Sequence, residues 1–429
     1  MYDLAIIGAG WAGFNAALRA KELGLKICLI EAAQIGGTCL NYGCIPTKTL
    51  IACAKIFSLA KRSSSFGVEL DNLRLNLATI QEKKDKVIRQ LALGMQSKLS
   101  GIDFINSPAK IVSTKAVKVD GRIIDAKFIL IATGSHPIQL PELKFDRKQI
   151  ISSDDALILS EVPQSLLVIG GGVIGCEFAS LFSTLGAQVT VAEKMLRLLP
   201  TEDKDISRKI EVIFKKKGIK VFTGADKSSF DLENYSKVLV CVGRAPNTTG
   251  LSVENLGLQL ENNRIVVDDY LKSSLDNIYA AGDCTGHVML AHYAAYQGVM
   301  AVENMFSGIR QKVDNLVVPV CVFTEPQIAS VGVKEDDALA SGTRIKVHKF
   351  DFRASALAQI MDETEGFVKI ISHQDTGQII GASIVGPLAT ELIATLVVAI
   401  SSHLTVSAVG AMIFAHPTFS ESLRETVKN

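Results

Sequence analysis

Two distant stretches of the chain share one pattern of apolar and polar positions. In Leu4–Glu31 and again in Leu166–Glu193, an apolar run leads into G-x-G-x-x-G, a segment of helical periodicity, a glycine and a second apolar run that ends in glutamate. Short apolar runs bounded by glycine are typical of buried strands, and the periodic segment between them is typical of a helix. Each stretch therefore predicts a β-α-β unit with parallel strands.

The three glycines of each motif have positions that suit a bound dinucleotide. In order, they allow a tight turn, close approach of the backbone to a pyrophosphate, and packing of the helix on its strand. They are Gly8, Gly10 and Gly13 in the first motif and Gly170, Gly172 and Gly175 in the second. The helix N-terminus offers N–H groups to the phosphates, and the final glutamates, Glu31 and Glu193, are placed to bind ribose hydroxyls. Two such sites on one chain predict a tightly held FAD and an exchangeable nicotinamide coenzyme.

Three more apolar runs end at a glycine or an acid. Phe128–Ser135, Val238–Asn247 and Ile278–Cys284 are predicted strands whose ends approach a ligand, and Asp283 is placed to accept a hydrogen bond from a ribityl hydroxyl. Beyond about residue 320 the pattern changes to strands followed by apolar helical segments. The expected fold is α/β, with two Rossmann-like dinucleotide-binding domains and a C-terminal α+β module.

Composition and charge exclude several classes of function. The chain of 429 residues is 48% hydrophobic and has a formal net charge of +1, a balance that does not attract nucleic acid or an anionic membrane. The N-terminus lacks the basic and apolar regions of a secretory signal. Polar residues interrupt the uncharged stretch Leu392–Ala415, so we expect a buried or subunit-interface helix followed by a turn, and not a membrane span. Eight cysteines are too few for a disulfide scaffold, so a cytoplasmic location is expected.

Two of these cysteines, Cys39 and Cys44, lie close together in the segment GGTCLNYGCIP. A zinc site would need further cysteine or histidine ligands at short spacing, so no metal site is expected. A structural disulfide here would close only a short loop and would restrain the unfolded chain little. A redox-active pair beside the first nucleotide unit explains the spacing better, and a helix starting just after Cys44 would lower a thiolate pKa.

A possible base lies near the C-terminus, where His416 precedes a proline and is soon followed by Glu421. Thiol–disulfide exchange needs a base for the thiol proton, and a carboxylate can orient an imidazole for that role. The residues alone leave a catalytic and a structural histidine equally open.

Together these motifs resemble the pyridine nucleotide-disulphide oxidoreductases, the flavoprotein disulfide reductases, over essentially the whole chain. GGTCLNYGCIPTK resembles the redox-disulfide signature of the family, AAGDCTG its second flavin motif, and FTEPQIASVG and HPTFSE parts of its dimerisation domain. Leu40, Ile45 and Thr47 are most similar to the dihydrolipoamide dehydrogenase branch.

The resemblance implies a homodimer with three kinds of domain. The FAD-binding domain would comprise residues 1–145 and 265–317, the inserted NAD-binding domain residues 146–264, and the interface domain residues 318–429.

The resemblance also implies the roles of the redox residues. Cys39 would form the mixed disulfide with substrate, and Cys44 would contact the flavin. His416 of the partner subunit, oriented by Glu421, would be the acid–base group.

The two cofactor sites follow from the same resemblance. Lys48 and Glu177 would form an ion pair where hydride reaches or leaves the flavin. The FAD site would comprise Gly8, Gly10, Gly13, Glu31, Gly37, Thr38, Lys48, Ala109, Thr133, Gly134, Asp283, Met289, Leu290, Ala291 and His292. The NAD site would comprise Gly170, Gly172, Val173, Ile174, Gly175, Glu193 and Gly243. The carboxylate of Glu193 favours NAD over NADP, because it would repel a 2′-phosphate.

The implied activity is that of a dihydrolipoyl dehydrogenase. The dithiol would be dihydrolipoamide on a lipoyl-bearing acyltransferase or carrier protein of a 2-oxoacid dehydrogenase or glycine cleavage system, and its electrons would pass through a Cys39–Cys44 disulfide and FAD to NAD. An NAD(P)H-dependent reductase of another small disulfide and a redox sensor without turnover are the alternatives. The chain departs from the family where Tyr42 is bulkier than usual, where Ala109 replaces a glycine, and where the link between Gly224 and Lys237 is short.

Overall fold

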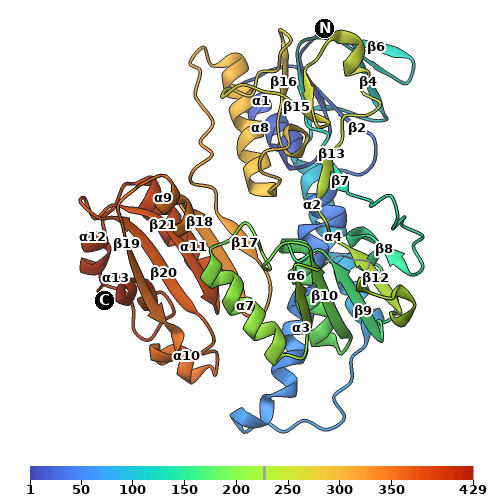
Figure 1. Cartoon of the computed structure of the whole chain (residues 1–429). Helices are drawn as coiled ribbons and strands as arrows, with labels where there is room; N and C mark the ends of the chain where they lie inside the picture. The colour runs from blue at the N-terminus through green and yellow to red at the C-terminus, as the bar shows by residue number, and fades with distance from the viewer. Residues whose placement is uncertain (226–228, 429) are drawn as a thin grey trace.

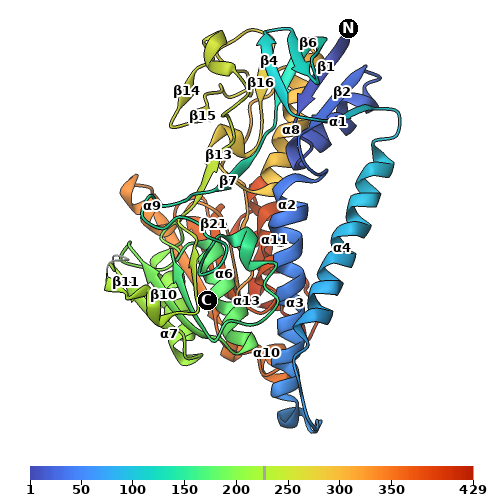
Figure 2. The same ribbon diagram turned by 90° about the vertical axis from the view of Figure 1, so that its right-hand side faces the viewer.

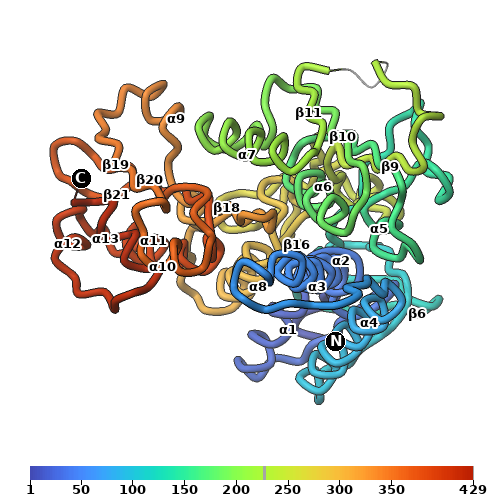
Figure 3. The backbone as a smooth tube through the Cα atoms, turned by 90° about the horizontal axis from the view of Figure 1, so that it is seen from below, coloured from blue at the N-terminus to red at the C-terminus, as the bar shows by residue number. Residues whose placement is uncertain are grey.

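The computed structural model of the chain describes residues 1–225 and 229–428, which form three large β-sheets with their helices (Figure 1). Two sheets belong to Rossmann-like units, and the third is antiparallel. Viewed from below, the antiparallel sheet, in orange and red, lies on one side of the molecule and the two nucleotide-binding units lie on the other (Figure 3). This arrangement agrees with the predicted α/β fold.

The first sheet forms the N-terminal unit. Its elements are β1 (Tyr2–Ile7), α1 (Trp11–Glu22), β2 (Ile27–Glu31), β3 (Asp103–Asn106), β4 (Ala109–Ser113), β5 (Ala116–Val119), β6 (Arg122–Ile131), β16 (Ile278–Ala280) and α8 (Ala291–Phe306). The seven strands follow the order β3-β2-β1-β6-β5-β4, with β16 also paired to β6. Helices α1 and α8 pack side by side on this sheet, where Ala16, Ala17 and Ala301 are fully buried. Small side chains on both helices let them approach closely.

The second sheet forms the second Rossmann-like unit. Its elements are β8 (Ile150–Ile151), α5 (Ser153–Ala156), β9 (Ser165–Ile169), α6 (Val173–Leu185), β10 (Gln188–Glu193), α7 (Lys204–Lys216), β11 (Lys220–Thr223) and β12 (Lys237–Val240). All five strands are parallel, in the order β11-β10-β9-β12-β8. The short link noted in the sequence lies between β11 and β12 and contains residues 226–228, which are outside the described residues.

The third sheet and its helices form the C-terminal module. They are β17 (Val320–Val322), β18 (Gln327–Gly332), α9 (Glu335–Ala340), β19 (Ile345–Asp351), α10 (Ala356–Ile360), β20 (Phe367–His373), β21 (Ile379–Gly386), α11 (Ala389–Ser401), α12 (Val406–Ala411) and α13 (Glu421–Lys428). The strand order is β17-β18-β21-β20-β19, with every neighbouring pair antiparallel. The apolar stretch Leu392–Ala415 contains most of α11, a turn and α12, as expected for a helix followed by a turn.

Three helices cross from the first unit towards the second. They are α2 (Gly37–Tyr42), α3 (Cys44–Lys61) and α4 (Leu77–Lys98), and α3 and α4 run side by side along one edge of the molecule (Figure 2). Within the described residues, Gly37–Lys61 passes the length and hydropathy test for a membrane span, a test that core helices of globular proteins also pass. Its α3 part packs against α4 and α6, and apolar side chains such as Ile56 stay exposed.

Two short strand pairs lie outside the three large sheets. β7 (Ser135–Pro137) pairs with β13 (Arg244–Pro246) where the chain passes between the first two units. β14 (Leu260–Glu261) pairs with β15 (Arg264–Ile265) beside the first sheet. The predicted boundary at residue 264 falls inside β15, and Leu251, Val253 and Leu258 before it pack into the core of the first sheet. We therefore place the return to the FAD-binding part between β13 and Leu251.

The sequence repeat is also a repeat in backbone geometry. Gly8 and Gly170 have φ angles of +105° and +106°, in the left-handed region that favours glycine. A Cβ on Gly13 or Gly175 would lie 1.8 or 1.9 Å from the carbonyl oxygen of Gly8 or Gly170 in the same motif. Both motifs therefore need their first glycine for the turn and their third for contact between helix and strand.

Candidate active site

One large cavity joins the two Rossmann-like units. Its volume is about 2170 Å³, whereas pockets for single small molecules are typically about 300–1,000 Å³. Both glycine motifs, both cysteines of the pair, Lys48 and Glu177 line it. The cavity therefore has room for more than one extended ligand and contains the predicted redox residues.

The two glutamates after the motifs have equivalent hydrogen bonds. Glu31 Oε2 accepts the Ala9 N–H at 2.6 Å, and Glu193 Oε2 accepts the Gly171 N–H at 2.5 Å. The second oxygen of each carboxylate accepts a backbone N–H two residues further along the chain, at 2.8 and 2.6 Å. Each carboxylate is thus fixed beside its glycine turn, where this fold places the ribose of a dinucleotide.

The backbone beside the cavity is free of obstruction. A Cβ on Gly134 or Gly172 would have no heavy atom within 4 Å, and one on Gly10 would meet only Gly37 Cα at 3.9 Å. These three glycines and Gly37 all line the cavity, so a ligand can come close to their backbone. The donors and the space therefore fit two dinucleotides, one at each motif.

Most predicted cofactor residues meet at this cavity. All of them line it except Gly13 and Gly175, which pack helix against strand instead. Asp283 also accepts a hydrogen bond from Ser135 Oγ at 2.5 Å, which holds its carboxylate in place.

Cys39 and Cys44 lie at the junction of two helices. Cys39 is within α2 and Cys44 is the first residue of α3, so the second helix begins at Cys44 itself. Both are free thiols in this structure, which corresponds to the reduced state of the pair. A hydrogen bond between the two thiols lowers the pKa of Cys44 to about 7, helped by the charge of Lys48 and opposed by burial. The same hydrogen bond and burial raise the pKa of Cys39, so Cys44 is the thiol that ionises first.

Lys48 and Glu177 form an ion pair between α3 and α6. Lys48 Nζ lies 2.9 and 2.8 Å from the two oxygens of Glu177, whose side chain is only 4% exposed. Glu177 Oε1 also accepts the Phe323 N–H at 2.9 Å, and Lys48 Nζ lies 4.7 Å from the centre of the Phe323 ring. The pair is rigidly held, with the lysine end facing the cavity.

His416 and Glu421 lie away from the cavity of their own chain. His416 Nδ1 is 2.9 Å from Glu421 Oε1, and Glu421 Oε2 accepts the Thr418 N–H at 2.9 Å. The Thr418 N–H and His416 lower the pKa of Glu421. The His416 side chain is 71% exposed on the C-terminal module, so one chain does not bring it to Cys39. Its predicted use by the partner subunit stays a prediction.

Several cavity residues were not predicted from the sequence. Trp11, Arg244, Cys321 and Phe323 all line the cavity. Arg244 Nε donates to Ser135 Oγ at 2.8 Å and so supports Asp283. Trp11 lies inside the first glycine motif and Arg244 directly follows Gly243. Their closeness in sequence to predicted site residues could have identified both.

Comparisons with known proteins agree with this geometry. The model of the pyridine nucleotide-disulphide oxidoreductase family matches residues 2–298, and that of the family's dimerisation domain matches residues 318–427. The chain is 38% identical to a dihydrolipoyl dehydrogenase of Bacillus subtilis, covering 99% of this chain and 97% of that protein. It is 37% identical to a dihydrolipoyl dehydrogenase of Chlamydia muridarum, covering 99% and 96%.

Solved structures show the same fold. LpdA from Mycobacterium tuberculosis superposes with a TM-score of 0.93 at 29% identity, covering 99% of this chain and 98% of that one. RclA from Escherichia coli, described as an HOCl-induced flavoprotein disulfide reductase, superposes with a TM-score of 0.89 at 30% identity, covering 100% and 99%.

The chain therefore belongs to the pyridine nucleotide-disulphide oxidoreductase family. It is an NAD-dependent flavoprotein disulfide oxidoreductase that uses FAD, and its dimerisation domain supports a homodimer.

Proposed function

We propose that the protein oxidises protein-bound dihydrolipoamide with NAD as the final electron acceptor, the reaction of a dihydrolipoyl dehydrogenase. The main support is whole-chain identity of 36–38% to curated dihydrolipoyl dehydrogenases, combined with a Cys39/Cys44 pair in the cavity between two dinucleotide motifs. The family also contains reductases of other disulfides, so the substrate depends on measurement.

The first half-reaction begins from the oxidised Cys39–Cys44 disulfide. A thiolate of the substrate attacks Cys39 Sγ, a substrate–Cys39 bond forms, the Cys39–Cys44 bond breaks, and Cys44 leaves as a thiolate. A leaving thiol of lower pKa departs faster, and the pKa of Cys44 is about 7. His416 of the partner subunit takes the proton of the attacking thiol in this proposal, because only the thiolate is nucleophilic.

The second substrate thiol completes the exchange. It loses its proton and attacks the substrate sulfur bound to Cys39, so the product disulfide forms and Cys39 leaves as a thiolate that takes up a proton. The enzyme then holds the two electrons of the substrate as the dithiol that this structure contains.

The chain's own residues prepare the cavity for electron transfer onward. Lys48 and Glu177 keep one positive and one negative group fixed beside the cysteines. FAD bound at the first motif would supply the carrier that passes the two electrons of the dithiol to NAD. Glu193 favours NAD at the second motif, because a 2′-phosphate would meet a buried carboxylate.

A lipoyl-bearing protein is the proposed partner. Dihydrolipoamide on the acyltransferase or carrier protein of a 2-oxoacid dehydrogenase or glycine cleavage system fits a dithiol oxidase of this class. We also infer a cytoplasmic location, because eight cysteines in 429 residues are too few for a disulfide scaffold.

The test is an anaerobic titration of the purified holoenzyme with dihydrolipoamide, followed by NAD, with visible absorption recorded throughout. A long-wavelength thiolate–flavin band that appears with the dithiol and disappears with NAD supports the proposal. A protein that only NADH or NADPH reduces would retain its family but lose this substrate.

A disulfide reductase running in the opposite direction is the second candidate, because RclA, a disulfide reductase, shares the fold at a TM-score of 0.89. Turnover of NADH or NADPH with a panel of small disulfides, at rates above the dihydrolipoamide rate, would favour it.

A further inference from the structure

The indole of Trp11 is a feature of this cavity that the proposed mechanism does not use. Trp11 is the first residue of α1, lies within the first glycine motif and is the one tryptophan of the 429-residue sequence. It lines the cavity together with Cys39.

Backbone contacts hold the Trp11 and Cys39 segments against each other. The Gly36 N–H donates to the Ala9 carbonyl oxygen at 2.8 Å. A Cβ on Gly37 would lie 2.9 Å from Gly10 Cα, so the two backbone segments are in contact at glycines that have no side chain. The residue after Gly10 and the α2 helix that contains Cys39 are therefore fixed relative to each other.

The Trp11 N–H is a buried donor in need of an acceptor. Its Nε1 atom is shielded from solvent and, within the part of the chain that the structure describes, has no hydrogen-bond partner of ordinary geometry. Buried polar groups without partners are rare in native proteins, and a redox or catalytic role is one of the recognised explanations.

The sulfur of Cys39, which lines the same cavity as Trp11, changes its acceptor strength during the reaction. In the dithiol state Cys39 donates its proton to Cys44, and a neutral thiol sulfur is a weak acceptor. A thiolate is a much stronger acceptor, because hydrogen bonds to ionised groups are shorter and stronger. Trp11 and Lys48 both act to lower the pKa of Cys39, against the Cys44 hydrogen bond and burial, which raise it.

We propose that the Trp11 indole N–H donates a hydrogen bond to the Cys39 thiolate and stabilises it as a leaving group. The step is the second one described above: the substrate sulfur bound to Cys39 is attacked, the product disulfide forms, and Cys39 departs with the electron pair before it takes up a proton. This assignment to a reaction step rests on the proposed function, whereas the hydrogen bond to the thiolate does not.

The expected effect of removing the N–H is a rise in the pKa of Cys39. A hydrogen bond to a charged group is worth enough to move a pKa by about one to two units. Trp11→Phe replaces the two-ring indole with a single phenyl ring, so it removes the N–H donor and keeps an aromatic side chain. Phe14→Leu is the matched control, because Phe14 is buried on the same helix and does not line the cavity.

The experiment uses FAD-loaded protein carrying Cys44→Ser, so that Cys39 is the remaining thiol of the pair. The rate of iodoacetamide alkylation at Cys39 is followed against pH by mass spectrometry of its peptide, with and without Trp11→Phe or Phe14→Leu. We expect the apparent pKa to rise by about one to two units with Trp11→Phe and to stay unchanged with Phe14→Leu.

Two results would overturn the proposal. An unshifted pH profile of Cys39 alkylation in the Trp11→Phe protein would contradict an interaction between the indole N–H and Cys39. Loss of FAD on desalting with an unshifted profile would assign the N–H to the cofactor instead. Failure of the protein with both cysteines to oxidise dihydrolipoamide, alongside a shifted profile in the Cys44→Ser protein, would remove the proposed substrate and leave the hydrogen bond standing, so the two proposals fail separately.

A second measurement needs no substitution at Trp11. Because the sequence contains one tryptophan, protein labelled with ¹⁵N-tryptophan gives one indole N–H resonance. In the Cys44→Ser protein, this resonance should move downfield as Cys39 ionises, with the same midpoint as the alkylation profile. A resonance that does not respond to ionisation of Cys39 contradicts the proposal, even if Trp11→Phe fails to fold.

Discussion

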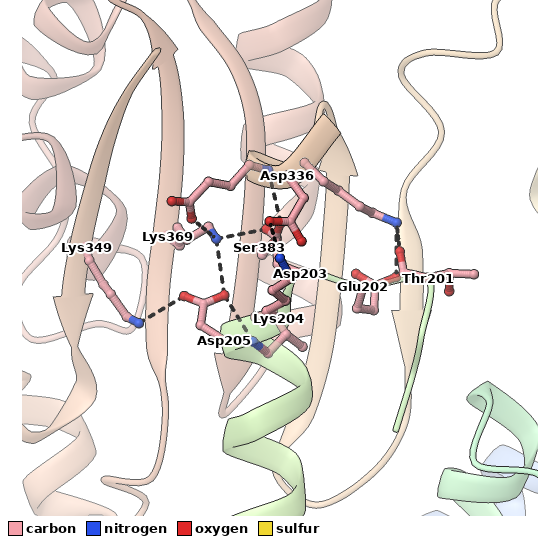
Figure 4. Close-up of polar contacts among 12 residues, drawn as sticks. Thr201, Glu202, Asp203, Lys204, Asp205, Asp336, Lys349, Lys369 and Ser383 are labelled. Atoms are coloured by element: carbon pink, nitrogen blue, oxygen red, sulfur yellow. Dashed lines mark hydrogen bonds and ion pairs between the residues drawn. The ribbon is translucent and has the colours of Figure 1, made fainter. Parts of the chain in front are cut away.

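Two lysines of this molecule are held by carboxylates in opposite ways. Lys369 on β20 is 1% exposed and lies 3.0 Å from Asp203, the residue before α7, and 3.1 Å from Asp205 in the first turn of α7 (Figure 4). It also lies 2.8 Å from Glu335, the first residue of α9. Lys48 on α3 is 30% exposed and, among the described residues, has one carboxylate partner, Glu177, at 2.8 Å. The first lysine is enclosed, whereas the second opens onto the cavity.

The difference separates a structural charge cluster from a reactive one. Burial acts to lower the pKa of Lys369, but Glu335, Asp203 and Asp205 outweigh it and raise the pKa above its ordinary value. The positive charge of Lys369 is thus surrounded by three carboxylates, and the cluster joins the second Rossmann-like unit to the antiparallel sheet. Lys48 also acts beyond its ion pair with Glu177, because its positive charge lowers the pKa of Cys44. A charged side chain that faces a cavity and shifts the pKa of a neighbouring group is typical of a functional site.

The largest expected effect lies in the reactive region. Cys39→Ser removes the sulfur that forms the mixed disulfide, so dihydrolipoamide turnover should fall by about a thousandfold or more. Steady-state kinetics measure the loss, and flavin absorbance and the thermal midpoint should stay close to those of the parent protein. Substantial turnover in Cys39→Ser would contradict the assigned role.

The enclosed lysine should show the reverse behaviour. Lys369→Met leaves three carboxylates without their shared partner, and breaking a buried ion pair from one side costs about 3–5 kcal/mol. Urea unfolding measures the stability, and kcat of the folded protein should change little. Lys349→Met is the matched control, because Lys349 pairs with Asp205 at the surface, where ion pairs contribute about 0–1 kcal/mol. Equal losses in both variants would remove the distinction.

Lys48 should affect a pKa more than stability. Lys48→Met removes the positive charge that favours the Cys44 thiolate, so the pKa of Cys44 should rise from about 7, by roughly one unit or more. Ultraviolet thiolate absorbance of the anaerobically reduced protein, followed against pH, measures the change. Lys369→Met should leave the pKa of Cys44 unchanged. A shift in this variant as well would show that the two regions are electrostatically coupled.

The smallest effect is expected within the enclosed cluster. Asp205→Asn leaves Lys369 with Asp203 and Glu335, so it should cost only about 1 kcal/mol at neutral pH. Lys369 and Lys349 lower the pKa of Asp205 against the effect of burial. The stability that this carboxylate contributes is therefore present above its ordinary pKa of 3.8 and is lost as the pH falls through the lowered value. Urea unfolding of both proteins should converge at acid pH, and a constant difference would exclude a charge effect.

Residues that act through their near neighbours in the chain were predictable. The glycine turns, the ribose glutamates and the cysteine pair each depend on spacing within one strand–turn–helix segment, and the same motifs carry the family resemblance. Glu193, for example, bonds to the Gly171 N–H of its own β-α-β unit. The predicted boundary at residue 264 was less accurate, because the packing of Leu251 and Val253 depends on a sheet formed by distant residues.

The sequence by itself determined the class of fold, the two dinucleotide motifs and the thiol pair, because local backbone geometry requires those residues at those spacings. Only the tertiary structure decided that the Trp11 N–H is buried without an ordinary partner among the described residues, and that Lys369 is enclosed by three carboxylates. Those relations join residues far apart in the sequence. Burial and charge pairing are set by what surrounds a side chain in space, which no local pattern specifies.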